Sequence, residues 1–423
     1  MDEKIVILSK YNFWNGNVPE TGFPRHDYTY KIMDYLNTTL VKVLVGQRRV
    51  GKSYILRQIA SQLIRNGIPP ENIFYINKEF IEYDFIVTYK ELEETVNVYK
   101  AYFKPKGKFY LFIDEIQMIK GWEHFVNSYS QNFADPCEIF ITGSNSEMLS
   151  GELATLLSGR YIKFEIFPFS YAEYLGIAKK QKSRQSYMEY MATGALPELF
   201  MLPNEESKRN YVSAIKDTIL LRDIIQRYNI KDAKLLEDVF IYLVNNASNP
   251  ISVANILNYF QSKKRKTSYD TLSNYISYLE QSFLIHKVER FSIKGKEVLS
   301  GIYKYYINDL SFKNYLYPGF DYGVGYKLEN LLFLELKRKG YMVYIGTFRD
   351  KEIDFIAKKG DKMIYIQCCY MLIDEKVIAR EYSPLQTIKD NYDKYVVTMD
   401  EVKFSSKEGI EHIQAWNFSD IIH

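Results

Sequence analysis

The chain has 423 residues, of which 47% are hydrophobic and 25% are charged, so we expect two to four globular domains and not a mainly disordered chain. Lys and Arg total 55 against 52 Asp and Glu, and a net charge of only +3 means that any nucleic-acid-binding surface must be local. No stretch approaches the roughly 18 apolar residues that suggest a membrane-spanning helix, and we expect no membrane partner.

The cysteines argue against a disulfide framework. Cys368 and Cys369 are adjacent, Cys137 stands alone, and no CxxC metal spacing occurs. The apolar run from Ile5 to Leu8 is also far too short for the core of a secretory signal. We therefore expect a reducing, cytoplasmic location.

Short apolar runs alternate with helical patterns between residues 25 and 170. The runs predict strands at residues 41–45, 73–76, 109–113, 138–141 and 161–166. Several of them are almost continuously apolar, as in a parallel sheet that helices cover on both faces. Residues 52–64 carry apolar side chains at helical spacing, and Asn66-Gly67 would end that helix. The alternation predicts an α/β domain.

A phosphate-binding loop follows the first of these strands. The sequence GQRRVGKS at residues 46–53 matches G-x-x-x-x-G-K-[ST] and lies between an apolar strand and an amphipathic helix. Its glycines let backbone N–H groups approach an anion without a Cβ clash. Lys52 would bring a positive charge to the β- and γ-phosphates, and Ser53 would offer its hydroxyl to Mg²⁺. The residues expected to bind the nucleotide are Gly46, Gln47, Arg48, Arg49, Val50, Gly51, Lys52, Ser53 and Tyr54.

Two acids end the third predicted strand. Asp114 and Glu115 follow the apolar run at residues 109–113. A carboxylate at the carboxyl end of a parallel strand lies at the edge of the sheet where ligands bind. We expect Asp114 to hold Mg²⁺ through its water shell and Glu115 to act as the general base for the attacking water.

Four runs make the chain similar to a known family. GQRRVGKS, LFIDEIQ, FITGSN and LSGRYIKFEIFPFSYAEY resemble the AAA+-type P-loop ATPases of a large, mostly uncharacterised prokaryotic family, in which a C-terminal module of unknown function follows the ATPase domain. The resemblance extends from about residue 25 to about residue 400. It implies an oligomer, either a ring or an open assembly, that binds and hydrolyses ATP with Mg²⁺.

The resemblance also implies roles for polar residues outside the loop. Ser144 or Asn145 matches the position that contacts the γ-phosphate or the attacking water, although either could instead cap a helix. Arg160 matches an arginine finger from a neighbouring subunit, or it forms a structural salt bridge. Arg48 and Arg49 could face the nucleotide or a subunit interface. The expected catalytic residues are Lys52, Glu115, Asn145 and Arg160.

The chain changes character after residue 170. Residues 171–235 are helical in pattern, and we expect a lid over the nucleotide. Helices expected near residues 233–245, 253–260 and 268–281 are followed by β-like runs at 283–285 and 288–293. This order resembles a winged helix-turn-helix.

The third of these helices would be the one that enters a DNA major groove. Four cations precede this helix and could neutralise phosphates. Its outer face carries no Arg or Lys, so we expect few contacts with the bases. Winged helices also bind proteins, and both DNA and a protein partner remain open. The candidate DNA contacts are Lys263, Lys264, Arg265, Lys266 and Asn274.

The last hundred residues resemble the PD-(D/E)XK nuclease fold. Glu329 on an expected helix and Asp354 on an expected strand match the first two acids of the metal site in that fold. Gln367 and Cys369 stand where active members carry the third acid and the lysine. Because a neutral amide binds Mg²⁺ weakly and a thiol cannot replace a cation, we expect a degenerate nuclease-like site at Glu329, Asp354 and Gln367 that has lost cleavage.

These patterns predict an α/β chain with an AAA+-like P-loop parallel sheet, a helical lid, a winged helix-turn-helix and a restriction-endonuclease-like α/β domain. The expected divisions are an N-terminal segment at 1–24, the ATPase core at 25–170, the lid at 171–235, the winged helix at 236–315 and the C-terminal domain at 316–423. The leading hypothesis is a homo-oligomeric ATPase, with ATP and Mg²⁺ as cofactors, that couples nucleotide state to DNA or a protein partner. The alternatives are a low-turnover nucleotide-gated switch or scaffold, and an ATP-dependent nuclease.

Overall fold

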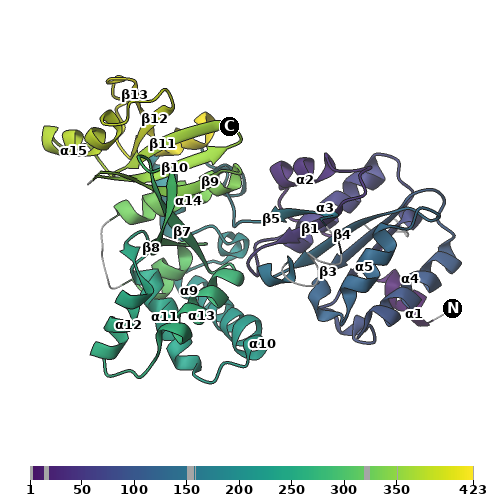
Figure 1. The fold of residues 1–423 in the computed structure, drawn as a ribbon. Helices are drawn as coiled ribbons and strands as arrows, with labels where there is room; N and C mark the ends of the chain where they lie inside the picture. Colours follow the sequence, from purple (N-terminus) through teal and green to yellow (C-terminus); the bar gives the residue numbers. More distant parts are fainter. Residues whose placement is uncertain are drawn as a thin grey trace. The chain divides into compact units, whose positions relative to one another are not determined.

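The computed structural model describes residues 3–13, 19–149, 157, 159–318, 324–349 and 351–422. The chain divides into two compact units, Met1–Ile166 and Phe167–His423, which Figure 1 shows in purple to blue and in teal to yellow. Each unit contains its own β-sheet. No helix in the described parts of the chain is both long enough and apolar enough to cross a bilayer.

The first unit is built on five parallel strands in the order β2-β3-β4-β1-β5. Every residue of the central strands β1 and β3 is buried, as is every residue of β2, so the predicted parallel α/β sheet is confirmed. The strands are β1 (Val41–Val45), β2 (Ile73–Asn77), β3 (Phe109–Asp114), β4 (Cys137–Gly143) and β5 (Tyr161–Glu165).

Helices cover both faces of this sheet. Figure 1 shows α2 and α3 along one side of it and α4 and α5 along the other. The helix after the phosphate loop begins at Lys52, where Gly51 takes a left-handed conformation with φ 96°. The helices are α1 (Glu3–Ser9), α2 (His26–Met33), α3 (Lys52–Arg65), α4 (Tyr89–Phe103) and α5 (Trp122–Ser130).

The second unit contains one mixed sheet of eight strands in the order β13-β12-β11-β10-β9-β7-β8-β6. The pairing of β7 with β9, from Arg290↔Ile345 to Ser292↔Thr347, joins its two halves. The expected division between residues 315 and 316 therefore lies within one continuous sheet. The strands are β6 (Pro250–Ile251), β7 (Ile285–Ser292), β8 (Glu297–Ile307), β9 (Met342–Phe348), β10 (Lys351–Lys359), β11 (Lys362–Cys368), β12 (Asp393–Thr398) and β13 (Ile410–Gln414).

The helices of this unit lie in three groups along the chain. The first group continues through a π-helical turn at Ile219–Ile225. In the second, α13 buries Leu272, Tyr275, Ile276 and Leu279, the stripe that helical spacing predicts. The helices are α7 (Tyr171–Ala178), α8 (Arg184–Thr193), α9 (Glu205–Thr218) and α10 (Gln226–Tyr228); α11 (Ala233–Asn245), α12 (Val253–Ser262) and α13 (Tyr269–Gln281); and α14 (Gly325–Arg338), α15 (Glu375–Gln386) and α16 (Phe418–Ile421).

The hairpin after α13 differs from the sequence prediction. The runs at 283–285 and 288–293 predict two strands, but residues 285–292 form the single strand β7, and its partner is β8. Phe283 has a φ of 57° and so ends the preceding turn before the strand begins. The reversal comes at Gly295 and Lys296, between the paired residues Ser292 and Glu297. The two predicted runs are separated by the polar residues His286 and Lys287, which lie within β7, and a register shift follows between Val288 and Arg290.

Candidate functional site

The order of the strands brings the two predicted motifs of the first unit together. Strand β4 lies between β1 and β3, with Val45 opposite Gly143 and Ile113 opposite Ile141. Since the three strands are parallel, the loop after β1 and the acids after β3 lie at the same edge, on either side of the end of β4.

The phosphate loop is held close to the neighbouring strand. Gly46 has a φ of 152°, and a Cβ atom there would lie 2.3 Å from the carbonyl oxygen of Ile166. Only glycine fits this approach. Lys52 Nζ donates to the carbonyl oxygens of Gly46 at 2.9 Å and Gln47 at 3.1 Å, and it lies 3.9 Å from Glu115 Oε1. The loop lysine and the predicted base are therefore neighbours.

Asp114 is fully buried and tightly hydrogen-bonded. Its Oδ2 accepts hydrogen bonds from Tyr75 Oη at 3.2 Å and Asn77 Nδ2 at 3.0 Å. Burial raises the pKa of Asp114, and the Glu115 carboxylate adds to the effect, while hydrogen bonds from Ser53 and a threonine oppose it. Ser53 and Asp114, the two residues predicted to hold Mg²⁺, are therefore close enough to interact electrostatically.

Thr142, which the sequence prediction missed, connects the two acids. Its hydroxyl donates to Asp114 Oδ1 and accepts from the backbone N–H of Glu115 at 2.9 Å. Glu115 has a φ of 54°, an uncommon conformation for a residue other than glycine, asparagine or aspartate. A polar residue within the apolar run of β4 was the signal in the sequence that could have identified Thr142.

Ser144 and Asn145 follow β4 at the same edge and are 1% and 0% exposed. Within the described chain, the Ser144 hydroxyl is buried without a hydrogen-bond partner, so it does not cap the turn that follows. An unsatisfied buried hydroxyl is costly. The unpartnered Ser144 hydroxyl fits a site in which a phosphate oxygen or a water molecule supplies the missing hydrogen bond.

Arg25, which the sequence prediction also missed, contacts the phosphate-binding loop. Its guanidinium is 2% exposed, donates from Nη1 to the carbonyl oxygen of Val50 at 2.8 Å, and lies over the Tyr28 ring at 4.6 Å. Tyr54 packs against Gly22 and under the Arg57 guanidinium at 4.3 Å. Nothing in the local sequence identifies Arg25, because its contact depends on the fold.

The other predicted arginines differ in their surroundings. Arg48 Nη1 forms an ion pair with Glu79 at 2.6 Å, and Arg49 is exposed with a φ of 68°. Arg160 is exposed at the start of β5, where its carbonyl oxygen accepts from the N–H of Val41. Because β1 and β5 are parallel, Arg160 lies at the amino edge of the sheet, opposite its own phosphate loop.

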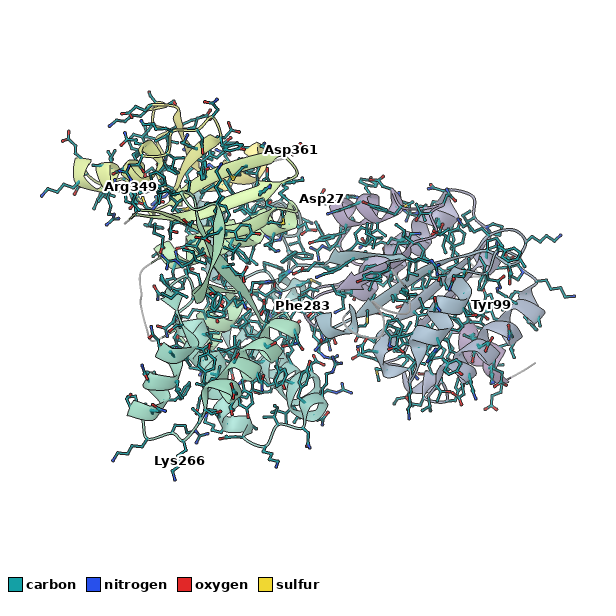
Figure 2. The ribbon with its side chains drawn as sticks, in the orientation of Figure 1. Asp27, Tyr99, Lys266, Phe283, Arg349 and Asp361 are labelled. Carbon is teal, nitrogen blue, oxygen red and sulfur yellow. The ribbon has the colours of Figure 1, made fainter. Side chains whose placement is uncertain are left out.

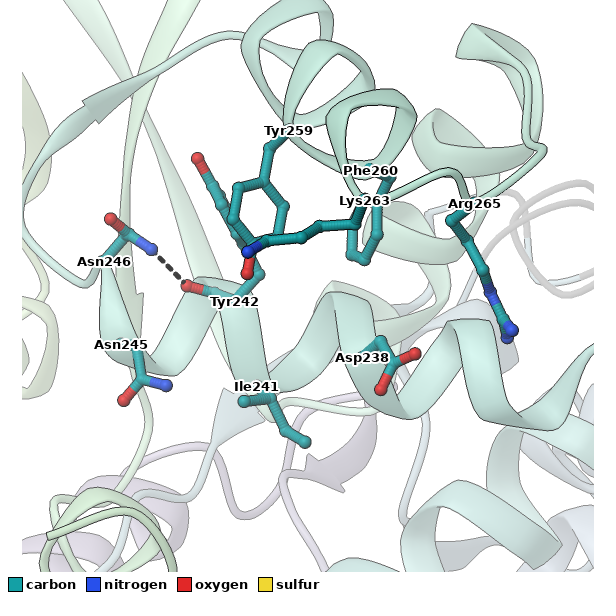
Figure 3. A pocket seen from close by; sticks show the side chains of 9 residues that line it. All are labelled: Asp238, Ile241, Tyr242, Asn245, Asn246, Tyr259, Phe260, Lys263 and Arg265. Atoms are coloured by element: carbon teal, nitrogen blue, oxygen red, sulfur yellow. Dashed lines mark hydrogen bonds between the residues drawn. The ribbon is translucent and has the colours of Figure 1, made fainter. Parts of the chain in front are cut away.

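The basic loop of the second unit, residues 263–266, lies beside a pocket of about 560 Å³ between α11 and α12. Figure 3 shows Lys263 running past the Tyr259 ring, 5.9 Å from its centroid, with Tyr242 below. Arg265 Nη2 forms an ion pair with Asp232 at 3.0 Å. Figure 2 shows Lys266 extending away from the ribbon, and Asn274 is exposed on α13. The candidate DNA contacts therefore differ in how free their charges are.

The predicted nuclease-like residues meet in the second unit, but around a lysine. Lys304 Nζ lies 3.0 Å from Glu329 Oε1, 2.8 Å from Glu352 Oε1 and 3.6 Å from Asp354 Oδ1. Gln367 turns aside: its Oε1 accepts from the N–H of Asp354 at 3.4 Å, and its Nε2 donates to a neighbouring glutamate. The sequence prediction missed Lys304 because it lies on β8, outside the expected motif.

Burial dominates the electrostatics of this cluster. It raises the pKa values of Asp354 and Glu329, and Lys304 opposes the rise. Burial disfavours the charged form of Lys304, but Glu329, Asp354 and Glu352 outweigh it and raise its pKa. Cys369, at the expected lysine position, is buried, and burial raises its pKa to about 12. With Lys304 in place, no set of three acidic, histidine or cysteine side chains in the described residues is arranged to hold a metal ion.

The chain matches two family models and, among other relatives, two proteins that align with it over most of their length. Residues 38–175 match the model of an AAA domain, and residues 184–322 match a domain of unknown function, DUF8612. An uncharacterised protein of Haemophilus influenzae is 36% identical over 394 residues, which cover 92% of this chain and 96% of the relative. An uncharacterised protein of Methanocaldococcus jannaschii is 30% identical over 404 residues, covering 90% of this chain and 88% of the relative.

Two solved structures show distant likeness to the chain. The Thermotoga maritima RuvB Holliday junction branch migration motor has a TM-score of 0.33 at 16% identity, covering 63% of this chain and 90% of its own. The Aeropyrum pernix ORC1 protein in complex with DNA has a TM-score of 0.33 at 13% identity, covering 75% of this chain and 97% of its own. Similarity at this level supports no inference about activity or partners.

Proposed function

We propose that this chain is a Mg²⁺-dependent ATPase. It belongs to the family of its H. influenzae and M. jannaschii relatives, and it carries an AAA domain at residues 38–175. The observation that carries the proposal is the arrangement around β4. Lys52 Nζ lies 3.9 Å from Glu115 Oε1, and Thr142 joins Asp114 to the backbone of Glu115. This arrangement supports the proposal that Lys52 binds phosphate, Asp114 binds the metal and Glu115 acts as the general base at one edge of the sheet.

The residues at this edge suit a magnesium-bound nucleotide. The Ser53 hydroxyl and the Asp114 carboxylate, which interact electrostatically, would supply the oxygen donors that Mg²⁺ prefers. Mg²⁺, when bound, neutralises charge on the phosphates. Lys52 would bind the β- and γ-phosphates, and Glu115 would accept the proton of the attacking water. The buried Ser144 hydroxyl, or the neighbouring Asn145 amide, would orient that water.

The test compares ATP binding and phosphate release in wild type, Lys52→Ala and Glu115→Gln. We expect Lys52→Ala to lose nucleotide binding, because the loop loses its charge. We expect Glu115→Gln to keep binding while turnover falls by about 10²- to 10⁴-fold, the usual contribution of a general base. The matched control is Glu93→Gln, which makes the same change at an exposed position of α4 in the same unit.

Three results would count against the proposal. Unchanged ATP affinity in Lys52→Ala would place the nucleotide elsewhere. Wild-type turnover in Glu115→Gln would remove Glu115 from the chemistry. Negligible turnover already in wild type, with ATP bound, would favour the alternative of a nucleotide-gated switch or scaffold.

We also propose that the protein works as a homo-oligomer. Arg160 lies at the sheet edge opposite its own phosphate loop, so it could reach a γ-phosphate only in a neighbouring copy. Its exposure supports that role. A structural salt bridge for Arg160 remains the competing interpretation.

We propose further that the second unit engages DNA through the basic loop, with a winged-helix arrangement of α11, α12, α13, β7 and β8. Lys263, Lys264 and Lys266 form no ion pair with the described part of the chain, so their charges are available for phosphates. Arg265 is partly neutralised by Asp232. The exposed Asn274 offers one amide for base contact.

Salt dependence of DNA binding tests this proposal. Replacing Lys263, Lys264 and Lys266 by alanine should weaken binding to double-stranded DNA and lower the slope of log K against log salt by about 0.9 for each phosphate that the loop no longer neutralises. The control replaces the exposed residues Lys358, Lys359 and Lys362, which changes the charge of the second unit equally. Equal effects in the two triple variants would mean that the basic loop does not bind DNA, and a protein partner would then be favoured.

A further inference from the structure

The cluster of Glu329, Glu352 and Asp354 already contains a positive charge. Three carboxylates from α14 and β10 converge on the Nζ atom of Lys304, whose side chain is 4% exposed. Oxygen donors gathered around one small cation are the surroundings that proteins ordinarily give to a hard divalent ion. Here the cation is part of the chain.

We propose that Lys304 occupies the position that a divalent cation would take among Glu329, Glu352 and Asp354, so that this cluster is closed to Mg²⁺ and Mn²⁺. The assignment goes beyond the proposed ATPase function, because it concerns the second unit alone.

The remaining contacts of the carboxylates support this assignment. Glu329 Oε1, which faces Lys304, also accepts from Tyr306 Oη at 2.7 Å. Asp354 Oδ2 accepts from the N–H of Cys368 at 2.8 Å, which leaves Oδ1 toward the lysine. A divalent ion that coordinated the same oxygens would lie at the ammonium position, and the two charges would repel each other.

Access does not explain the exclusion. A cavity of about 560 Å³ opens beside the cluster and is lined by Glu352 and Gln367, and Glu352 is 38% exposed on its side chain. An ion in solution can therefore reach Glu352, the carboxylate of the cluster that lines this cavity. In this proposal the site is closed because the Lys304 ammonium fills its central position, while its Glu352 side is open to solvent.

The lysine also connects parts of the fold that a metal ion would otherwise connect. Lys304 lies on β8, while Glu352 and Asp354 lie on β10, and two strands separate β8 from β10 in the sheet. Glu329 adds α14 to the same cluster. One ammonium thus ties three elements of the second unit together.

The experiment measures Mn²⁺ binding by electron paramagnetic resonance in the full chain without nucleotide. Wild type and Lys304→Arg should show no site that depends on Asp354. Lys304→Met should gain one Mn²⁺ site per chain, at least about tenfold tighter than any in wild type. Lys304→Met/Asp354→Asn should lose that site again. All variants keep the same phosphate loop, so its contribution cancels.

Two outcomes would overturn the proposal. One is an Mn²⁺ site in wild type that Asp354→Asn removes, and Mn²⁺-dependent cutting of plasmid DNA that Asp354→Asn abolishes would have the same meaning. The other is a folded Lys304→Met protein, judged by circular dichroism, that gains no site.

A second measurement decides the matter if Lys304→Met does not fold. The melting temperatures of wild type and Asp354→Asn are compared with and without Mn²⁺. A lysine-filled cluster predicts the same response to Mn²⁺ in both proteins. Stabilisation of wild type by Mn²⁺ that is absent in Asp354→Asn would show that the metal binds there and would overturn the proposal.

Discussion

Thr142 is the residue on which the geometry of the two acids depends. Its hydroxyl satisfies a carboxylate oxygen of Asp114 and the backbone N–H of Glu115, both buried. The hydrogen bond from the Glu115 N–H holds Glu115 in a left-handed backbone conformation that residues other than glycine rarely adopt. One hydroxyl therefore orients both acids, Asp114 and Glu115.

We expect Thr142→Val to damage both stability and turnover. Valine keeps the shape of the side chain but leaves two buried polar groups without a partner, which costs about 1–3 kcal/mol for each group. Denaturant unfolding should show this loss, and phosphate release should fall because Glu115 loses its anchor.

Thr142→Ser is the control, since serine keeps the hydroxyl. It should retain most of the turnover and lose only the packing of one methyl group. A valine variant as stable and as active as wild type would show that the hydroxyl bridge does not position Glu115.

At the scale of elements, the loop after β1 is constrained by the strand beside it. A Cβ atom at Gly46 would meet the carbonyl oxygen of Ile166 at 2.3 Å. The N–H of Ile166 donates to the carbonyl oxygen of Val45 at 2.7 Å, so Ile166 cannot withdraw without breaking the contact between β1 and the end of β5. The contacts of Ile166 with Gly46 and Val45 therefore hold the phosphate-binding loop against the edge of the sheet.

Gly46→Ala should therefore destabilise the first unit and abolish ATP binding. Gly67→Ala is the matched control, because Gly67 has a φ of 94° but a Cβ atom added there would meet no other atom within 4 Å. The control should cost only the backbone strain, about 1–2 kcal/mol. Denaturant midpoints and ATP binding measure the difference, and equal effects in the two variants would contradict the close approach at Gly46.

At the scale of the whole molecule, the two units have separate sheets and separate cores. We expect two thermal transitions in calorimetry. ATP with Mg²⁺ binds only the first unit in our proposal, so at about 100 times its Kd it should stabilise that transition by about 2.7 kcal/mol and leave the other unchanged.

Lys52→Ala serves as the control for this effect, because it should show both transitions without the shift. An equal shift of both transitions in wild type would mean that the units unfold together or that both bind nucleotide.

The sequence determined the parts of the first unit that depend on local pattern. The apolar runs, their spacing and the turn residues between them predicted the five strands and the helix after the loop. The strands could be predicted because burial on both faces requires continuous apolar residues. The loop motif predicted Lys52 and Ser53 as site residues, and the strand end predicted Asp114, since in each case the proposed chemistry lies within a few consecutive residues.

Only the tertiary structure decided which distant side chains complete the sites. Arg25 reaches Val50, Thr142 joins Asp114 to Glu115, and Lys304 enters a cluster of acids from α14 and β10. The one sheet that joins the hairpin of β7 and β8 to β9 likewise has no local signal. The physical reason is the same in each case: strand order and side-chain burial are set by packing between segments far apart in the chain, and a local pattern carries no information about that pairing.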